Sequence, residues 1–361
     1  MIKFRFIGKL LSVLIIGMTF TLYGNPSKWY NNDEMVSFYE ALTKISSESL
    51  YVDTLHSIPQ SILKLYIRKI DRYGDYFSKE EYQAFLHTLT PEYAGVGMVL
   101  YQQNRYEKIL CIPTEKHLGK DKISKYDELV SVDGRSVEGK NFYLVSSWIR
   151  GKKNSSVTLE IRKSSGQLQS TTLKRTEQHF QSVQPIIENG TAIIQIVRFT
   201  GETPQELQGI LRQWPKSIPI VIDLRGNGGG DYFAALQSAD LLLPKNTLIS
   251  SIKTAKSHND YHASTSDLME GRPTFLLQDK FTASAAEVFI AALTQNDRAE
   301  SIGKRSFGKG VVQKFIPLTG GDALLLTYGK IITPNGKSYN KRGLLPTSNL
   351  SIEALLERLH P

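Results

Sequence analysis

Hydrophobic and polar positions change their spacing twice along the chain, and each spacing predicts a different kind of structure. Between residues 30 and 90, apolar residues recur at the three- and four-residue intervals of amphipathic helices, as in "SKEEYQAFLHTL". From Ala94 to about Arg175, short β-like runs are separated by turn residues, with one helical stretch among them. From about Val183 onward, strands and helices alternate. We therefore expect a helical region, a small barrel-like module and an α/β region, in that order.

The third region is the most regular. Its strands "TAIIQIVRF", "IPIVIDLR" and "PTFLLQ" alternate with the helical stretches "ETPQELQGILRQW", "DYFAALQSADLLL" and "SAAEVFIAALTQN". Continuous apolar strands between amphipathic helices are typical of a largely parallel sheet that is buried on both faces. In such sheets the working site lies at the carboxyl ends of the strands, so we expect it in the loops that follow them.

The first residues have the layout of an export signal. Lys3, Arg5 and Lys9 precede an apolar run from Leu10 to about Tyr23, and a polar stretch begins after residue 24. Such a run is short for a membrane span of about 20 residues and typical of a secretory signal. Because no Ala-x-Ala cleavage site follows, a retained N-terminal anchor is the alternative. Either interpretation places the rest of the chain outside the cytoplasm, in the periplasm or cell envelope.

Composition and charge narrow the class of protein further. The 361 residues are enough for two or three domains. The net charge of +9 is spread along the chain, so we expect a solvated surface, able to lie near an anionic membrane, and no nucleic-acid partner. The single cysteine, Cys111, excludes an intrachain disulfide and a multi-cysteine metal site. We expect no metal and no cofactor.

A glycine-rich loop follows the strand "IPIVIDLR". Four glycines in five residues indicate positive φ angles or a close approach to the backbone. Their N–H groups precede a helix and can hold a phosphate or the oxyanion of acyl transfer, and a plain tight turn is the third interpretation. The spacing is not that of a Walker loop. The glycines are Gly226, Gly228, Gly229 and Gly230.

Two further loops carry a serine and a lysine. Ser284 lies among alanines, and Glu287 follows three residues later, so Ser284 is either a helix cap in a capping box or a nucleophile. Lys309 lies between two glycines with Gln313 four residues on, and is either a flexible surface lysine or a general base. None of the seven histidines is close to these loops in sequence. A lysine base needs its pKa lowered from about 10.4 toward 7–8 by burial.

These loops and their order resemble those of the carboxyl-terminal processing proteases, also called tail-specific proteases. The resemblance also covers "IDRYGDYFSKEEYQAF", "YAGVGMVL", "YDELVSVDG" and "LTYGKIITPNGKSYNKRGLLPT". It implies a crotonase-like α/β protease core with an inserted PDZ domain and an N-terminal helical region. The implied boundaries are 1–24 for the signal or anchor, 25–92 for the helices, 93–176 for the PDZ domain and 177–361 for the core.

The resemblance also assigns roles to residues. It makes Ser284 the nucleophile, Lys309 the general base and Gln313 the residue that orients the lysine. The oxyanion hole consists of the N–H of Ala285 together with that of Gly229 or Gly230. The loop of Gly95, Val96 and Gly97 takes the terminal carboxylate of a substrate, which adds to the PDZ domain as a strand.

The implied function is an exported serine endopeptidase that acts on proteins through their C-terminal tails, with an adaptor or a second copy of the chain as further partners. The family often has serine where this chain has Thr282 and Ala286, and aspartate where it has Gln295 and Thr347. None of these departures removes the serine or the lysine. A non-catalytic envelope protein that binds peptides and an acyl-CoA enzyme of crotonase type are the alternatives.

Overall fold

The computed structural model describes two compact units of the chain, residues 1–61 and 62–361. In the first unit lie α1 (Asn32–Glu48) and the beginning of α2 (Ile58–Ile70). The predicted export signal, 1–24, lies outside the described residues. No helix in the described part has the length and apolarity that a membrane span requires. The described residues are 32–48, 58–88, 92–102, 108–113, 122–124, 126–179, 181–188, 191–215 and 218–359.

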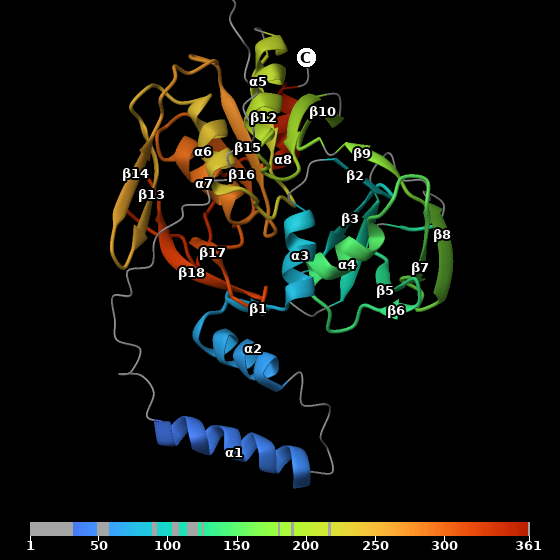
Figure 1. Cartoon of the computed structure of the whole chain (residues 1–361). Helices are drawn as coiled ribbons and strands as arrows, with labels where there is room; N and C mark the ends of the chain where they lie inside the picture. The colour runs from blue at the N-terminus through green and yellow to red at the C-terminus, as the bar shows by residue number, and fades with distance from the viewer. Residues whose placement is uncertain are drawn as a thin grey trace, which may run out of the picture. The chain divides into compact units, whose positions relative to one another are not determined.

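The larger unit contains a five-stranded sheet in the order β10-β11-β12-β15-β16 (Figure 1). Four of its strands are parallel, as expected, and β10 is antiparallel to β11. Successive side chains of a strand point to opposite faces. Ile220 and Ile222 therefore pack in the core with α5, α6 and α7, while Val221 packs in a separate core with α8. The elements are β10 (Val183–Glu188), β11 (Thr191–Ile196), α5 (Thr203–Gln213), β12 (Ile220–Asp223), α6 (Tyr232–Asp240), β15 (Thr274–Gln278), α7 (Ala285–Thr294), β16 (Glu300–Gly303) and α8 (Ile352–Leu359).

A second, antiparallel sheet in the order β1-β18-β13-β14, with β17 also paired to β18, was not expected from the sequence. Its first strand comes from the region expected to be helical, and Tyr76 of that strand pairs with Leu324 of β18. A three-residue strand is too short to give a periodic signal. The expected helical region therefore also contributes one strand to this sheet. The strands are β1 (Asp75–Phe77), β13 (Leu248–Thr254), β14 (His258–His262), β17 (Val311–Pro317) and β18 (Ala323–Ile332).

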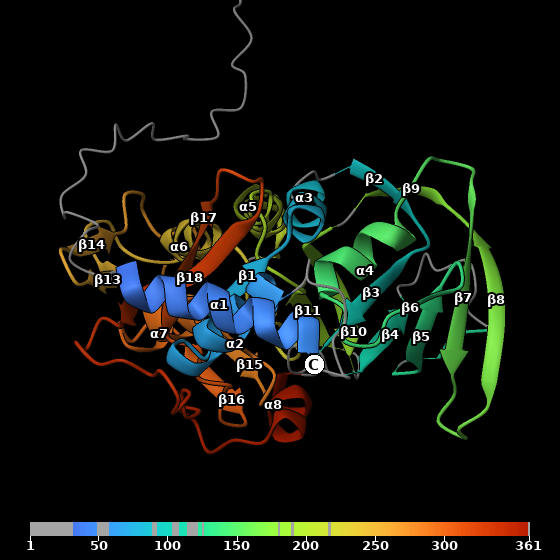
Figure 2. The same cartoon turned by 60° about the horizontal axis from the view of Figure 1, so that its bottom comes forward.

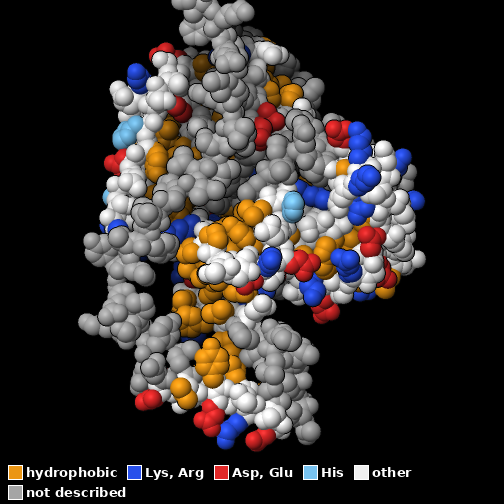
Figure 3. Space-filling view, viewed as in Figure 1, with side chains coloured by type: hydrophobic (Ala, Val, Ile, Leu, Met, Phe, Trp, Pro, Cys, Tyr) orange, Lys and Arg blue, Asp and Glu red, His pale blue; other side chains and the backbone are white. Residues whose placement is uncertain are grey.

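A small module with its own core lies between β2 and β9, which pair with each other (Figure 2). Its strands follow the order β3-β4-β5-β7-β8, β6 pairs with β5, and α4 contributes Val145 and Ile149 to the core. Acidic and basic side chains are interspersed on the face seen in Figure 3. The elements are β2 (Glu92–Gly95), β3 (Met98–Tyr101), β4 (Ile109–Pro113), β5 (Glu128–Val132), β6 (Arg135–Ser136), α4 (Phe142–Ile149), β7 (Ser156–Arg162), β8 (Leu168–Lys174) and β9 (Thr176–His179).

Aromatic side chains join the module to the antiparallel sheet. α3 (Lys79–His87) begins after its N-cap Ser78, which forms a capping box with Glu81. The ring of Phe85 on this helix lies 4.1 Å from that of Phe315 on β17 and 5.0 Å from that of Tyr143 on α4, measured between centroids. Such ring pairs contribute about 0.5–1.5 kcal/mol each beyond the area that they bury.

Cys111 in the core of the module should resist alkylation in the folded protein. Burial raises the pKa of its thiol to about 12, with the Asp127 carboxylate adding to the shift and Lys163 opposing it. The pKa in the unfolded chain is about 8.5. The neutral thiol therefore favours the folded state fully below pH ~8.5, and this contribution is lost as the pH rises toward the folded pKa. Iodoacetamide at pH 8, followed by mass spectrometry, should label Cys111 only when urea unfolds the protein. Rapid labelling of the folded protein would contradict this expectation.

Candidate active site

The three loops singled out in the sequence follow three parallel strands of one sheet. β12 ends at Asp223, β15 at Gln278 and β16 at Gly303, and the loops continue from these ends. Because the carboxyl ends of neighbouring parallel strands lie at the same edge of a sheet, the glycine loop, the serine loop and the lysine loop meet there.

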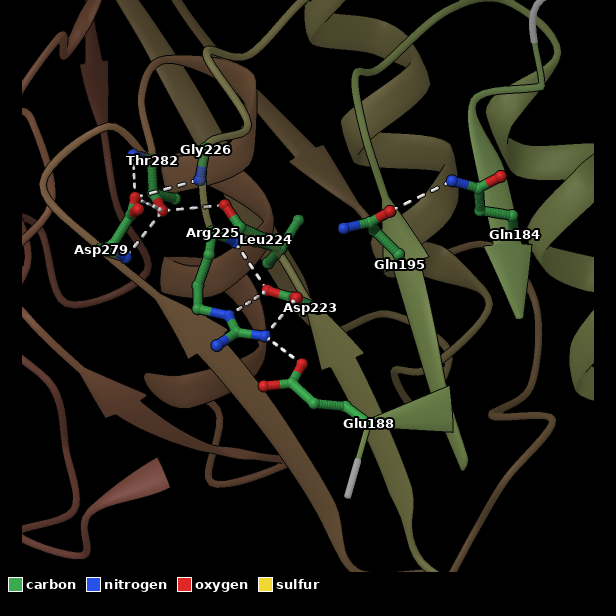
Figure 4. A network of polar contacts seen from close by, with 9 residues as sticks. All are labelled: Gln184, Glu188, Gln195, Asp223, Leu224, Arg225, Gly226, Asp279 and Thr282. Atoms are coloured by element: carbon green, nitrogen blue, oxygen red, sulfur yellow. Dashed lines mark hydrogen bonds and ion pairs between the residues drawn. The ribbon is translucent and has the colours of Figure 1, made fainter. Parts of the chain in front are cut away.

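A network of hydrogen bonds holds the glycine loop to the serine loop (Figure 4). Oδ1 of Asp279 accepts hydrogen bonds from the N–H of Gly226 at 3.1 Å and from the N–H of Thr282 at 3.0 Å. The Thr282 hydroxyl donates to the carbonyl of Leu224 at 2.8 Å. Beside this contact Arg225 is paired with Asp223 and with Glu188, and the hydrogen bond to Asp223 is the main reason that the pKa of Arg225 is raised. The two loops therefore form one fixed structure.

Ser284 occupies a strained turn directly before α7. Its φ of 55° and ψ of −118° are unusual for a residue with a side chain and cost on the order of 1–3 kcal/mol. The preceding Ala283 is held because its N–H donates to the carbonyl of Asn227 at 2.9 Å. A strained turn from strand to helix is the geometry that exposes the nucleophilic serine of α/β-hydrolases. The N–H of Ala285 is then the first of the helix, where backbone donors have no acceptor within the helix.

The glycine loop lies directly against Ser284. A Cβ atom at Gly229, whose φ is 102°, would lie 2.7 Å from the Cβ of Ser284 and 3.0 Å from the nitrogen of Ala285. Only glycine leaves this space open. The N–H of Gly229, one of the expected oxyanion donors, instead donates to Oδ1 of Asn227 at 2.8 Å. The N–H of Gly230, the other candidate, has no acceptor in the part of the chain that the structure describes.

Glu287 connects the serine loop with the lysine loop. Its fully buried carboxylate accepts four hydrogen bonds, two on each oxygen. Oε2 accepts from the N–H of Ser284 and from the N–H of Lys309, both at 2.8 Å. Oε1 accepts from the N–H of Gly308 at 2.7 Å and from the hydroxyl of Ser306 at 2.5 Å. Burial raises the pKa of Glu287, and the four hydrogen bonds oppose that shift without cancelling it.

Lys309 is not a flexible surface lysine. A Cβ atom at Gly308 would lie 2.7 Å from the nitrogen of Gly343, and one at Gly310 would lie 2.8 Å from the nitrogen of Asn340. The two flanking glycines are thus positions of close backbone packing. Lys309 itself is half-buried, and its Nζ lies 5.4 Å from the centroid of the Tyr73 ring.

Gln313 also contacts Tyr73, through a hydrogen bond to its backbone. A bulge between Val312 and Gln313 interrupts β17, so the four-residue spacing from Lys309 does not by itself place both side chains on one face. Nε2 of Gln313 donates to the carbonyl of Tyr73 at 2.6 Å. Both side chains therefore contact Tyr73.

The three residues of the expected carboxylate loop lie in the small module. Gly95 ends β2, Val96 is buried in the core of the module, and Gly97 has a φ of 69° just before β3. Among the described strands, β3 pairs on one side only, with β4. The ring centroid of Tyr101 at the end of β3 lies 6.0 Å from that of Phe281 in the serine loop.

Sequence reasoning assigned no role in the site to several residues that contact it. Glu287 was recognised only as a local capping partner, and Asn227 only as a member of the glycine loop. Tyr339 donates from its hydroxyl to the carbonyl of Ser284 at 3.4 Å, and burial raises its pKa well above the usual value. Tyr73 and Tyr339 lie in stretches that carry the family resemblance, but nothing in those stretches assigned either tyrosine a role in the site.

Comparison with known proteins identifies the class. Residues 190–350 match the family model described as Peptidase family S41. This result confirms the resemblance drawn from the three loops.

Individual relatives agree with this classification. The chain is 26% identical, over 88% of its length, to a "Probable CtpA-like serine protease" of Staphylococcus saprophyticus, and 29% identical, over 76%, to the protein of the same description in Staphylococcus aureus. It spans 66% and 56% of the lengths of those two relatives. A solved structure described as photosystem II D1 C-terminal processing protease has the same fold, with a TM-score of 0.63 and 21% identity over 90% of this chain and 91% of that one.

Replacement of Glu287 by glutamine should destabilise the protein by about 1–3 kcal/mol, because the side-chain NH₂ then faces at least one backbone N–H donor and leaves it unsatisfied. Urea unfolding should show this as a lower midpoint with an unchanged slope. Glu300→Gln, at an exposed glutamate of the same unit, is the matched control and should leave the midpoint in place. Equal midpoints for the two variants would show that the four hydrogen bonds of Glu287 contribute little.

Proposed function

We propose that the chain is an exported serine endopeptidase that cleaves proteins recognised by their C-terminal tails, with Ser284 and Lys309 as its catalytic dyad. The observation that supports this most directly is that one carboxylate oxygen of Glu287 accepts the N–H groups of both Ser284 and Lys309. The description of the staphylococcal relatives as serine proteases supports the same reaction class.

In the proposed reaction Ser284 Oγ attacks the carbonyl carbon of the scissile peptide and transfers its proton to neutral Lys309. The N–H groups of Ala285 and Gly230 stabilise the oxyanion that forms. Collapse of this intermediate expels the amine, which takes the proton from Lys309 and leaves an acyl-enzyme on Ser284. Water then attacks the ester, with Lys309 again accepting the proton, and releases the acid. The space beside Gly229 is where the oxyanion fits.

The small module is, in this proposal, a PDZ domain inserted into a crotonase-like core. The terminal carboxylate of the substrate binds the loop of Gly95, Val96 and Gly97, and the tail adds to β3 as a further strand. The contact between Tyr101 and Phe281 supports this direction, because it connects the end of β3 with the serine loop.

The proposal also covers the cellular location of the enzyme and its partners. The positively charged and apolar start of the chain supports export to the periplasm or cell envelope, with the signal cleaved or kept as an anchor. Protein substrates are its main partners, and an adaptor or a second copy of the chain is a further one. The reaction as proposed uses no metal or cofactor.

Removal of either dyad side chain should abolish cleavage. An unstructured protein substrate with a free C-terminus should be cut by the wild type, and Ser284→Ala and Lys309→Ala should each reduce kcat/KM by about 10³-fold or more without lowering the unfolding midpoint. Gel and mass analysis of the products measures the cleavage.

The same substrate with an amidated C-terminus tests recognition of the tail and should show a raised KM. A wild-type protein that binds the free tail tightly but does not cleave it would contradict the proposal. That result would favour a non-catalytic peptide-binding protein. Cleavage that persists in Ser284→Ala would exclude Ser284 as the nucleophile.

Gly229→Ala should also inactivate the enzyme, because the added methyl group occupies the space beside Ser284 and the nitrogen of Ala285. A loss of about 10²–10³ in kcat is typical when oxyanion stabilisation is removed. Gly228→Ala is the matched control, since a Cβ atom there meets no atom within 4 Å and its φ is not positive. Equal activity of the two variants would argue against an oxyanion site at Gly229.

A further inference from the structure

The turn that joins α2 to β1 contacts the lysine that the proposed mechanism makes the general base and the glutamine expected to orient it. Its contacts come from a single residue, Tyr73. The carbonyl of Tyr73 accepts the hydrogen bond from Nε2 of Gln313 at 2.6 Å, and its ring centroid lies 5.4 Å from Nζ of Lys309. The residues that meet here are more than 200 positions apart in the chain.

Asp71 fixes this turn to the antiparallel sheet. One oxygen of its carboxylate accepts from the N–H of Thr327 at 2.7 Å, and the other accepts from the Thr327 hydroxyl and from the N–H of Tyr73, both at 3.0 Å. Thr327 is the cross-strand partner of Gln313. The same carboxylate thus sets the position of Tyr73 relative to the strand pair that carries Gln313.

The turn has little room to adjust. The N–H of Asp71 donates to the carbonyl of Ile67 at 2.7 Å, and the N–H of Gly74 donates to the carbonyl of Asp71 at 3.0 Å. A Cβ atom at Gly74 would lie 2.7 Å from Ile67 and 2.9 Å from Asp71. The residue after Tyr73 is therefore restricted to glycine by close packing.

We infer that Tyr73 is a positioning residue for Lys309 and Gln313. Its carbonyl orients the amide of Gln313, and its ring shields Nζ of Lys309 from water. This inference rests on the proposed function. A carbonyl can only accept, so the atom of Gln313 that faces it is the amide nitrogen. Oε1 of Gln313 is then turned away from Tyr73 and can accept a hydrogen bond from the lysine amine.

The groups around Lys309 differ in whether they favour its charged ammonium form. Glu287 accepts the N–H of Lys309, and the guanidinium of Arg72 lies 5.7 Å from the centroid of the same Tyr73 ring. Asp71 is on the turn, and the hydroxyl of Tyr339 donates to the carbonyl of Ser284. The face of the Tyr73 ring attracts an ammonium group, whereas exclusion of water disfavours it. The shielding that we infer requires that the exclusion of water outweigh the attraction of the ring face for the ammonium group.

Substitutions at Tyr73 separate these effects. In Tyr73→Ala water reaches Nζ, the pKa of Lys309 rises, and the acid limb of the kcat/KM profile should move up by about one pH unit, which lowers activity about tenfold at pH 7. Tyr73→Phe keeps the ring and should match the wild type within about twofold. Tyr73→Leu keeps an apolar cover without a ring, so its acid limb should not move up. KM should stay within about twofold throughout, because Tyr73 does not bind substrate.

A matched control is available on the neighbouring strands. Nζ of Lys314 lies 5.6 Å from the ring centroid of Tyr328, in a similar geometry on the same β17–β18 pair. Tyr328→Ala should leave the pH profile unchanged. Should Tyr73→Ala fail to fold in a thermal unfolding test, Asp71→Asn replaces it: the loss of one acceptor loosens the turn, and kcat should fall severalfold at constant KM.

The outcomes distinguish this inference from the proposed function. An inactive wild type, or an active Ser284→Ala variant, would remove the proposed function and this inference with it. A wild-type pH profile in Tyr73→Ala, with Ser284→Ala inactive, would overturn the inference alone. An upward shift in Tyr73→Leu equal to that in Tyr73→Ala would also overturn it, because an apolar cover should be sufficient.

Discussion

The buried carboxylate of Glu287 is the interaction on which the arrangement of the site depends. It accepts hydrogen bonds from the backbone of the serine loop and from three residues of the lysine loop, Ser306, Gly308 and Lys309. A buried charge is costly unless hydrogen bonds compensate for it. Here the compensation comes from groups in both loops, so neither loop can move without leaving the carboxylate unsatisfied. The distance between the two loops is therefore fixed by the chemistry of one side chain.

The strain at Ser284 is maintained by the same surroundings. A residue with a positive φ persists only where its neighbours determine it from several sides. Asn227 accepts the N–H of Ala283, Glu287 accepts the N–H of Ser284, and Gly229 packs against Ser284 from the glycine loop. The two interpretations of Ser284, as a helix cap and as a nucleophile, are thus compatible with the same structure. Its position at the start of α7 brings the Glu287 hydrogen bond of a capping box to a serine whose turn suits a nucleophile.

The sequence allowed prediction of the parts of the fold that depend on local pattern. Continuous apolar strands gave the parallel sheet, and Ser78 gave the start of α3, because burial and capping act over a few residues. The same pattern could not identify β1, whose three residues form a strand only by pairing with β18. In the site, motifs marked Ser284 and Lys309. Tyr73 and Tyr339 contact the site from distant segments of the chain, and a local sequence pattern does not predict such contacts.

The attachment of Asp71 to Thr327 also sets an order of events during synthesis. The two residues are 256 positions apart, and β18, which carries Thr327, follows the small module and the glycine loop in the chain. Contacts of such long range form late, after the intervening segments have been made. A growing chain that has already completed the small module and the glycine loop still lacks the surroundings of Lys309. The molecule therefore acquires the contacts of Tyr73 with the site only after β18 has emerged and folded.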